Sequence, residues 1–115
     1  MARRHYDNSE VKIGDILHAG WGATMILHSF YQVVALNGRT QCTIIPVESV
    51  NTGYKGPFRN GIKVMQPIMQ TGETIRVSVI PSTEKNGYSV RIKDYQRAFY
   101  MNDIDEEYIE DTCGN

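Results

Sequence analysis

Short apolar runs separated by turn-forming residues recur along the whole chain. The clearest is residues 30–36, which are rich in the aromatic and β-branched side chains that strands favour. Asn37 and Gly38 follow, and both tolerate the positive φ that a type I′ turn needs. Residues 40–45 then return as an apolar partner run. The pattern therefore predicts an antiparallel hairpin over residues 30–45.

A second hairpin is indicated by strict alternation in residues 74–80 and 88–93, with Asn86 and Gly87 before the second run. Because successive side chains of a strand point to opposite faces, one set is expected in the core and the other in solvent. The residues expected to face inward are Ile75, Val77, Val79, Tyr88, Val90 and Ile92. Those expected to face outward are Arg76, Ser78, Ser89, Arg91 and Lys93.

Residues 11–17 predict a first strand that is interrupted by a turn at Gly14-Asp15, with Val11 and Ile13 on the same face. Residues 18–29 predict an irregular loop around Trp21, which stands between two glycines.

The remaining segments are shorter or rich in glycine and proline. Residues 51–61 predict a long loop, residues 62–65 a short strand, and residues 94–101 a helical turn. Five to six short strands with frequent turns are typical of a small all-β domain. We expect an SH3-like antiparallel barrel with a short C-terminal helical turn.

The length of 115 residues fits one domain. We expect a flexible N-terminal segment at 1–10, a single β-barrel domain at 11–102 and an acidic tail at 103–115. No apolar run approaches the roughly 18 residues of a membrane span, and no apolar stretch follows the N-terminal arginines as it would in a signal peptide. These features predict a cytoplasmic protein without membrane contact.

The chain offers little of the chemistry that metals and catalysis require. Cys42 and Cys113 are the two cysteines, they form no Cys-x-x-Cys pair, and they are expected to be reduced thiols. His18 and His28 lack the short spacing of a histidine metal motif. No nucleophile elbow is present. We therefore expect no metal, no cofactor and no enzymatic activity.

Charge is distributed unevenly along the chain, although the net charge is only −1. Residues 103–111 hold six of the 13 acids and no base, so the rest of the chain has an excess of five positive charges. The acids are Asp103, Asp105, Glu106, Glu107, Glu110 and Asp111. This acidic run could serve solubility, imitate a phosphate backbone, or fold back on the basic part of the chain.

Three motifs near the opening of the chain form a distinctive pattern: residues 12–17 (Lys-Ile-Gly-Asp-Ile-Leu), 21–22 (Trp-Gly) and 30–34 (Phe-Tyr-Gln-Val-Val). This pattern resembles a family of small SH3-like proteins from bacteriophages and bacterial mobile elements. It implies a phage or mobile-element origin and an SH3-like fold, but no particular activity. A polar loop follows Trp-Gly in the family, whereas residues 23–28 here are largely apolar.

These observations lead first to a protein-binding hypothesis. Trp, Tyr, Phe and Met are enriched at the centres of protein interfaces. The candidate partner-binding residues are Trp21, Met25, Ile26, Leu27, His28, Tyr54 and Phe58. The apolar loop could instead close one end of the barrel as a lid. The expected partner is a host protein or complex, and by analogy with other short phage proteins the expected task is inhibition of a host defence component, for example a CRISPR effector.

Two alternatives remain open. The first is a binder of a nucleotide, including a sponge for a nucleotide signal, or of single-stranded nucleic acid, because basic residues near aromatic rings can hold phosphates and bases. Its candidates are Arg59, Lys63, Arg76, Arg91, Lys93 and Tyr95, although exposed bases also protect sheet edges. The second is a toxin-like ribonuclease, which would share the opening Gly14-Asp15-Ile16 but lacks an expected Arg-Pro pair here.

Overall fold

The computed structural model describes residues 8–22, 25–81, 87–93 and 96–112, and these form strands, turns and loops without a helix. The strands are β1 (Ile16–Trp21), β2 (Leu27–Asn37), β3 (Gln41–Val47), β4 (Ser49–Gly56), β5 (Arg59–Val64), β6 (Ile75–Pro81), β7 (Tyr88–Lys93), β8 (Gln96–Tyr100) and β9 (Tyr108–Asp111). The described part of the chain contains no helix long and apolar enough to cross a membrane.

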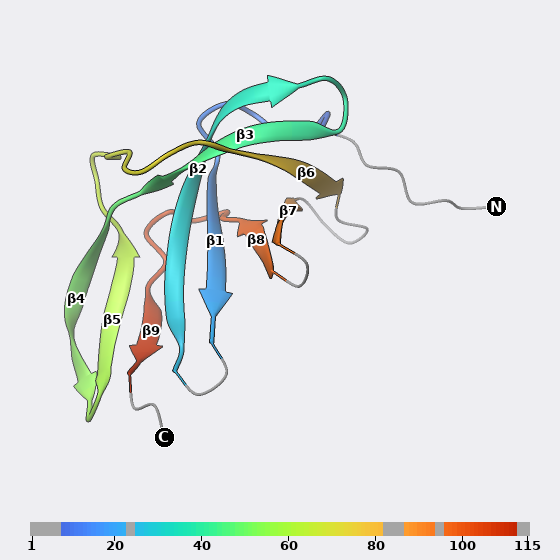
Figure 1. The fold of residues 1–115 in the computed structure, drawn as a ribbon. Helices are drawn as coiled ribbons and strands as arrows, with labels where there is room; N and C mark the ends of the chain where they lie inside the picture. The colour runs from blue at the N-terminus through green and yellow to red at the C-terminus, as the bar shows by residue number, and fades with distance from the viewer. Residues whose placement is uncertain (1–7, 23–24, 82–86, 94–95, 113–115) are drawn as a thin grey trace.

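Six strands form a closed antiparallel barrel in the order β1-β2-β3-β6-β7-β8 (Figure 1). Pairing of Leu17 in β1 with Tyr100 in β8 closes it. The predicted small all-β barrel is therefore confirmed. Both predicted hairpins are also present, as β2–β3 and β6–β7.

The barrel core is built from alternate residues of its strands, as the sequence pattern predicts, although Ser89, which was expected in solvent, is only 5% exposed. Val77, Val79, Tyr88 and Val90 are buried in it. Ile75 and Ile92, at the ends of the same pattern, are partly buried against this core. The other members come mainly from β1, β2 and β3, and they are Val11, Leu17, Ala19, Tyr31, Val33, Cys42, Ile44 and Ala98.

The remaining three strands form a second sheet in the order β4-β5-β9, which lies beside the outer face of β1 and β2 (Figure 1). A second core fills the space between the two sheets, and it contains Ile16, Phe30, Val47, Val64 and Met101. Phe30 points outward into this core, whereas its neighbour Tyr31 points into the barrel. The middle of β2 is thus covered on both faces, which explains its nearly continuous apolar sequence.

Strand β4 is irregular and lies at an edge of the second sheet. Its register with β5 shifts between Asn51 and Gly53 and again between Tyr54 and Gly56. Both glycines have positive φ, 130° and 138°. Residues 51–61 form most of a hairpin. The sequence nevertheless predicts a loop there, because the glycines that the bulges require are also typical of loops.

Four further expectations differ from the structure. Residues 11–15 form turns and not a strand, so Val11 is 3% exposed whereas Ile13 is 66% exposed. The segment around Trp21 is the regular end of β1. The predicted helical turn is wrong, because residues 96–100 are strand β8. The acidic segment contains strand β9, which completes the second sheet.

Candidate functional site

Three segments that are distant in sequence meet at one end of the molecule. Ile26, just before β2, exchanges two backbone hydrogen bonds of 2.9 Å with Asp111 at the end of β9. The amide of Thr112 donates to the carbonyl of Phe58, in the β4–β5 turn, at 2.8 Å. Figure 1 shows the end of β9 between the start of β2 and the β4–β5 turn. Backbone hydrogen bonds therefore fix this end of the molecule.

Large apolar side chains remain exposed on these three segments. We call this set the apolar end surface, and its members are Met25, Ile26, Leu27, Phe58 and Ile109. Their exposed fractions range from 37% for Leu27 to 62% for Phe58. Tyr54 of the neighbouring strand β4 is more exposed still. Four of the predicted partner-binding residues thus share one end of the molecule, and Ile109 joins them from a segment that the sequence indicated only as an acidic tail.

The backbone of Phe58 is in the left-handed region, with φ of 63°. This conformation is uncommon for a bulky residue and costs of order 1–3 kcal/mol. Glycine would occupy the position without that cost. The chain instead keeps an exposed aromatic ring at the turn, and strained positions of this kind are concentrated at functional sites.

Trp21 has a different role from the apolar end surface. Its side chain is partly buried against the barrel core, on the same face of β1 as Leu17 and Ala19. The indole Nε1 is buried and has no hydrogen-bond partner within the described residues. Trp21 therefore covers one end of the barrel, in agreement with the lid alternative for this residue.

His28, another predicted partner-binding residue, joins the barrel to β9. Its Nε2 lies 2.8 Å from the carbonyl oxygen of Ile109, and its Nδ1 lies 2.7 Å from Nε2 of His18. Because a carbonyl only accepts, we assign the His28 proton to Nε2, and His18 then donates to Nδ1 of His28. The carboxylate of Glu110 accepts the backbone N–H of His28 at 3.2 Å.

His18 is itself packed against β9. Its ring stacks on Tyr108, with centroids 3.7 Å apart and planes 10° from parallel. Burial, together with the nearby His28, lowers the pKa of His18 from 6.5 to about 4. Burial and the neighbouring Glu106 raise the pKa of Tyr108 to about 12. Both rings are therefore neutral at pH 7 in the folded protein.

The low pKa of His18 predicts a loss of stability in mild acid. Between about pH 6.5 and pH 4 the unfolded chain binds a proton at His18 that the folded chain does not, so stability falls as the pH decreases through this range. Allowing for the partial exposure of the ring, we expect a loss of about 1–2 kcal/mol from this group between about pH 7 and pH 5. Urea unfolding at the two pH values measures it.

The matched variant is His18→Gln, whose amide can still donate to His28 but does not titrate. Its stability should fall between the two pH values by about 1–2 kcal/mol less than that of the original chain. An equal fall in both proteins would show that His18 does not carry this dependence.

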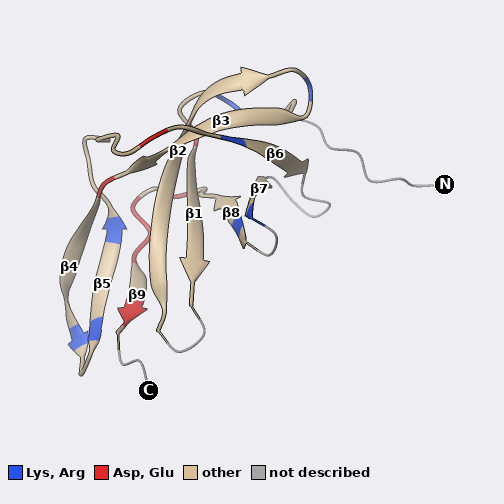
Figure 2. Cartoon of the chain, in the orientation of Figure 1, with Lys and Arg blue, Asp and Glu red and all other residues tan. Residues whose placement is uncertain are grey.

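The acidic segment neutralises the basic residues of the second sheet. Lys55 pairs with Glu107 at 3.3 Å, Arg59 with Asp111 at 3.2 Å and Lys63 with Asp105 at 3.4 Å. Figure 2 shows the blue and red segments of β4, β5 and β9 close together. The remaining acids also have local contacts. Asp103 accepts a hydrogen bond from the amide of Asp105, and Glu110 accepts one from the amide of His28. Glu106 lies close enough to Tyr108 to raise its pKa.

Consequently, the two sets of predicted phosphate-binding residues lie in different environments. Arg59 and Lys63 are ion-paired on the second sheet. Arg76, Arg91 and Lys93 lie on barrel strands β6 and β7 and are exposed. Tyr95 lies outside the described residues.

A shallow, open groove of about 330 Å³ lies where the chain leaves the barrel for the second sheet. It is lined by residues 28–31 of β2 and 46–49 of the β3–β4 connection.

Within the described residues, no three His, Cys, Asp or Glu side chains are arranged to hold a metal ion. Comparison of the chain with protein-family models, curated proteins and solved structures found no match.

Proposed function

We propose that this protein acts without catalysis, by binding a partner protein through the apolar end surface. The observation that carries the proposal is the exposure of five large apolar side chains on three segments that backbone hydrogen bonds hold together. A surface ordered before binding loses little conformational entropy when it binds. Burial of apolar surface is the main favourable contribution to most protein association.

The charges around this surface favour a protein over a nucleic acid. A nucleic-acid site needs cations that are free to contact phosphates. The bases nearest to the apolar end surface, Lys55 and Arg59, are already paired with Glu107 and Asp111. A mixed-charge rim around an apolar centre is typical of protein interfaces.

The kind of partner is suggested by the resemblance of residues 12–34 to small phage proteins. On that basis we propose that the partner is a protein of the bacterial host, that binding takes place in its cytoplasm, and that it inhibits a defence component by covering part of its surface. The apolar residues 25–27 replace the polar loop of that family. They are therefore suited to a contact that is specific to this protein.

The test is capture of the partner by the tagged chain, followed by affinity measurement with the purified partner. Ile26→Asp should weaken binding at least about 30-fold, because it places a charge within the proposed apolar contact. Phe58→Gly should also weaken binding while preserving the fold, because glycine suits the positive φ at this turn. Leu36→Asp is the matched control, since Leu36 is 44% exposed near the opposite end of β2.

The proposal requires that the first two variants lose binding and the control retains it. Equal binding by Ile26→Asp and the original chain would overturn it, as would equal losses in all three variants. The defence hypothesis has a separate readout: a bacterial strain with the relevant system should lose protection against phage when the original chain is expressed, but not when Ile26→Asp is expressed.

A further inference from the structure

A row of polar side chains that ends in two arginines crosses the outer face of the barrel on strands β3, β6, β7 and β8. The register aligns Gln41 of β3 with Ser78 of β6, Ser78 with Arg91 of β7, and Arg91 with Arg97 of β8. The alternate residues of these strands are buried in the barrel core, so the row faces outward. With strands about 4.8 Å apart, the row is about 14 Å long.

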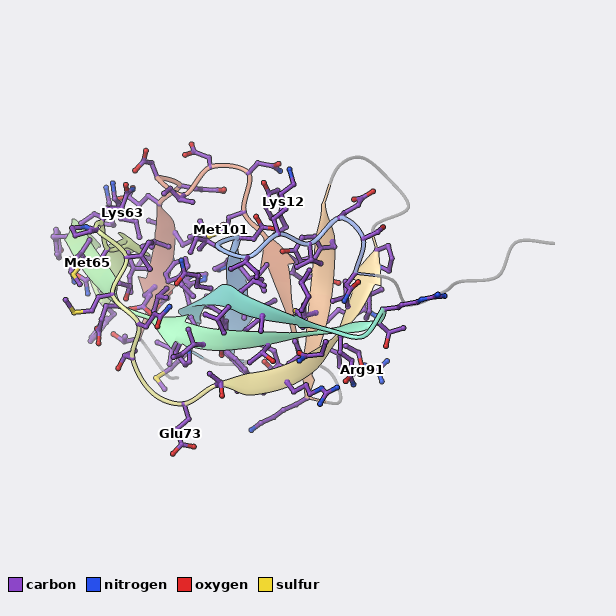
Figure 3. All side chains as sticks on the ribbon, turned by 90° about the horizontal axis from the view of Figure 1, so that it is seen from above. Lys12, Lys63, Met65, Glu73, Arg91 and Met101 are labelled. Atoms are coloured by element: carbon purple, nitrogen blue, oxygen red, sulfur yellow. The ribbon has the colours of Figure 1, made fainter. Side chains whose placement is uncertain are left out.

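Further positive charge extends this row on both sides. Arg76 lies two residues before Ser78 on the same face of β6, and its Nε donates to Oε1 of Gln41 at 2.8 Å. Lys93 lies two residues after Arg91, next to a bulge. Figure 2 shows blue segments on β6, β7 and β8, and Figure 3 shows Arg91 at the periphery of the molecule. We call Arg76, Arg91, Arg97 and Lys93 the basic row; all four are exposed.

The basic row is not compensated by acids within the described residues. The three ion pairs found there all belong to the second sheet. Arg91 and Arg97 face each other directly across β7 and β8, and like charges in this position destabilise a sheet. A bound anion would remove this repulsion. Guanidinium groups are particularly suited to phosphate, because they form paired hydrogen bonds with it.

An exposed aromatic ring lies beside the basic row. Phe99 is two residues after Arg97 on the same face of β8 and is 54% exposed. Arginines next to an open ring are the components that hold single strands, because the charges contact phosphates and the ring stacks on a base. The site is an open strand surface, which suits an extended chain of phosphates better than an enclosed nucleotide.

We propose that the basic row and Phe99 bind single-stranded nucleic acid, independently of the protein-binding surface proposed above. The net charge of the chain is −1, so such binding would depend on this local arrangement and not on general attraction. Neither Arg97 nor Phe99 was among the candidates from the sequence, because residues 94–101 predicted a helical turn.

The test is fluorescence anisotropy with labelled single strands of about 15 nucleotides, as DNA and as RNA, at increasing salt. Contacts to three or four phosphates predict that affinity falls about 20–50-fold between about 50 and 200 mM salt. The double variant Arg91→Gln/Arg97→Gln should bind more weakly and should show a shallower dependence on salt. Phe99→Ala should weaken binding at least about 5-fold at constant salt.

The matched control is Arg59→Gln/Lys63→Gln, which removes the same charge from the ion-paired sheet. Its affinity should stay within about 2-fold of that of the original chain. No binding of either strand at low salt would overturn the proposal, and so would equal losses in the two double variants. Tight binding of a poly-aspartate peptide of equal charge, unaffected by Phe99→Ala, would identify the ligand as an acidic protein and would also overturn it.

Discussion

Replacing Phe30 with alanine should lower the free energy of unfolding by about 3–5 kcal/mol. Phe30 is 2% exposed and lies in the second core, between the barrel and the three-stranded sheet. Its ring centroid is 5.5 Å from that of His18 and 5.8 Å from that of Tyr108. The substitution would therefore leave a cavity where β9 is held against β1 and β2. Urea denaturation measures the loss.

Hydrogen exchange distinguishes this effect from general destabilisation. Phe30→Ala should increase amide exchange in β5 and β9 before it increases exchange in the barrel, because the cavity lies under the second sheet. Leu17→Ala is the control, since Leu17 is fully buried in the barrel core. It should instead increase exchange in the barrel strands. Identical patterns in the two variants would show that the two cores do not act as separate units.

Replacing Gly22 with alanine should cost about 3 kcal/mol or more, the upper end of the range for strained backbone. Gly22 has φ of 112°, a conformation that residues with a Cβ rarely adopt. An added Cβ would also overlap the carbonyl group of Met25. The overlap involves backbone atoms, so relieving it would move the backbone at Gly22 or at Met25, a member of the apolar end surface. We therefore expect loss of partner binding together with loss of stability.

Gly14→Ala separates the two causes. Gly14 has a similar φ of 104°, but nothing lies within 4 Å of an added Cβ. Its substitution should cost only the backbone strain, about 1–2 kcal/mol, and should leave partner binding unchanged. Thermal and urea unfolding of both variants measure the difference. Equal costs in the two variants would mean that the contact with Met25 has no effect.

The barrel could be predicted because its strands carry their own signals. The Asn-Gly turn at 37–38 and the alternation of residues 75–80 are local patterns, and local patterns fix which face of a strand is buried. Buried residues such as Val77 and Val90 follow directly from them. The apolar run at residues 30–36 also predicts the middle of β2, but most of β1 and the start of β2 fall in residues 18–29, which predict a loop. The second buried face of these strands depends on the second sheet, which the local sequence does not indicate.

The second sheet could not be predicted because its strands depend on distant partners. β9 is only four residues long and contains two acids, so the strand preference of Tyr108 and Ile109 is too short a signal to predict it. Its ladder with β5, its ion pair between Arg59 and Asp111 and the His28 contact to Ile109 join residues about 50 to 80 positions apart. β4 was hidden by its glycines, which predict a loop unless the partner strand is known.

The candidate site, like the fold, could be predicted only where its residues carry a local signal in the sequence. The exposed residues Met25 to Leu27 and Phe58 were indicated by apolar character in segments that predicted loops. The acids around Ile109 predict a solvated tail, so the sequence does not point to this residue. The sequence places Trp21 on the same surface, but its parity with Leu17 and Ala19 in β1 directs it to the barrel core. That parity was not visible while residues 18–29 were expected to form an irregular loop.

The irregular shape of β4 has a consequence for the behaviour of the protein at high concentration. An exposed edge strand offers unpaired backbone groups that can recruit a second chain and begin aggregation. In β4 the two register shifts interrupt the regular spacing of these groups, and Lys55 adds a charge near the end of the strand. Bulges and lysines are common means of protecting such edges. The glycines that obscured β4 in the sequence thus help to keep this edge from seeding fibres.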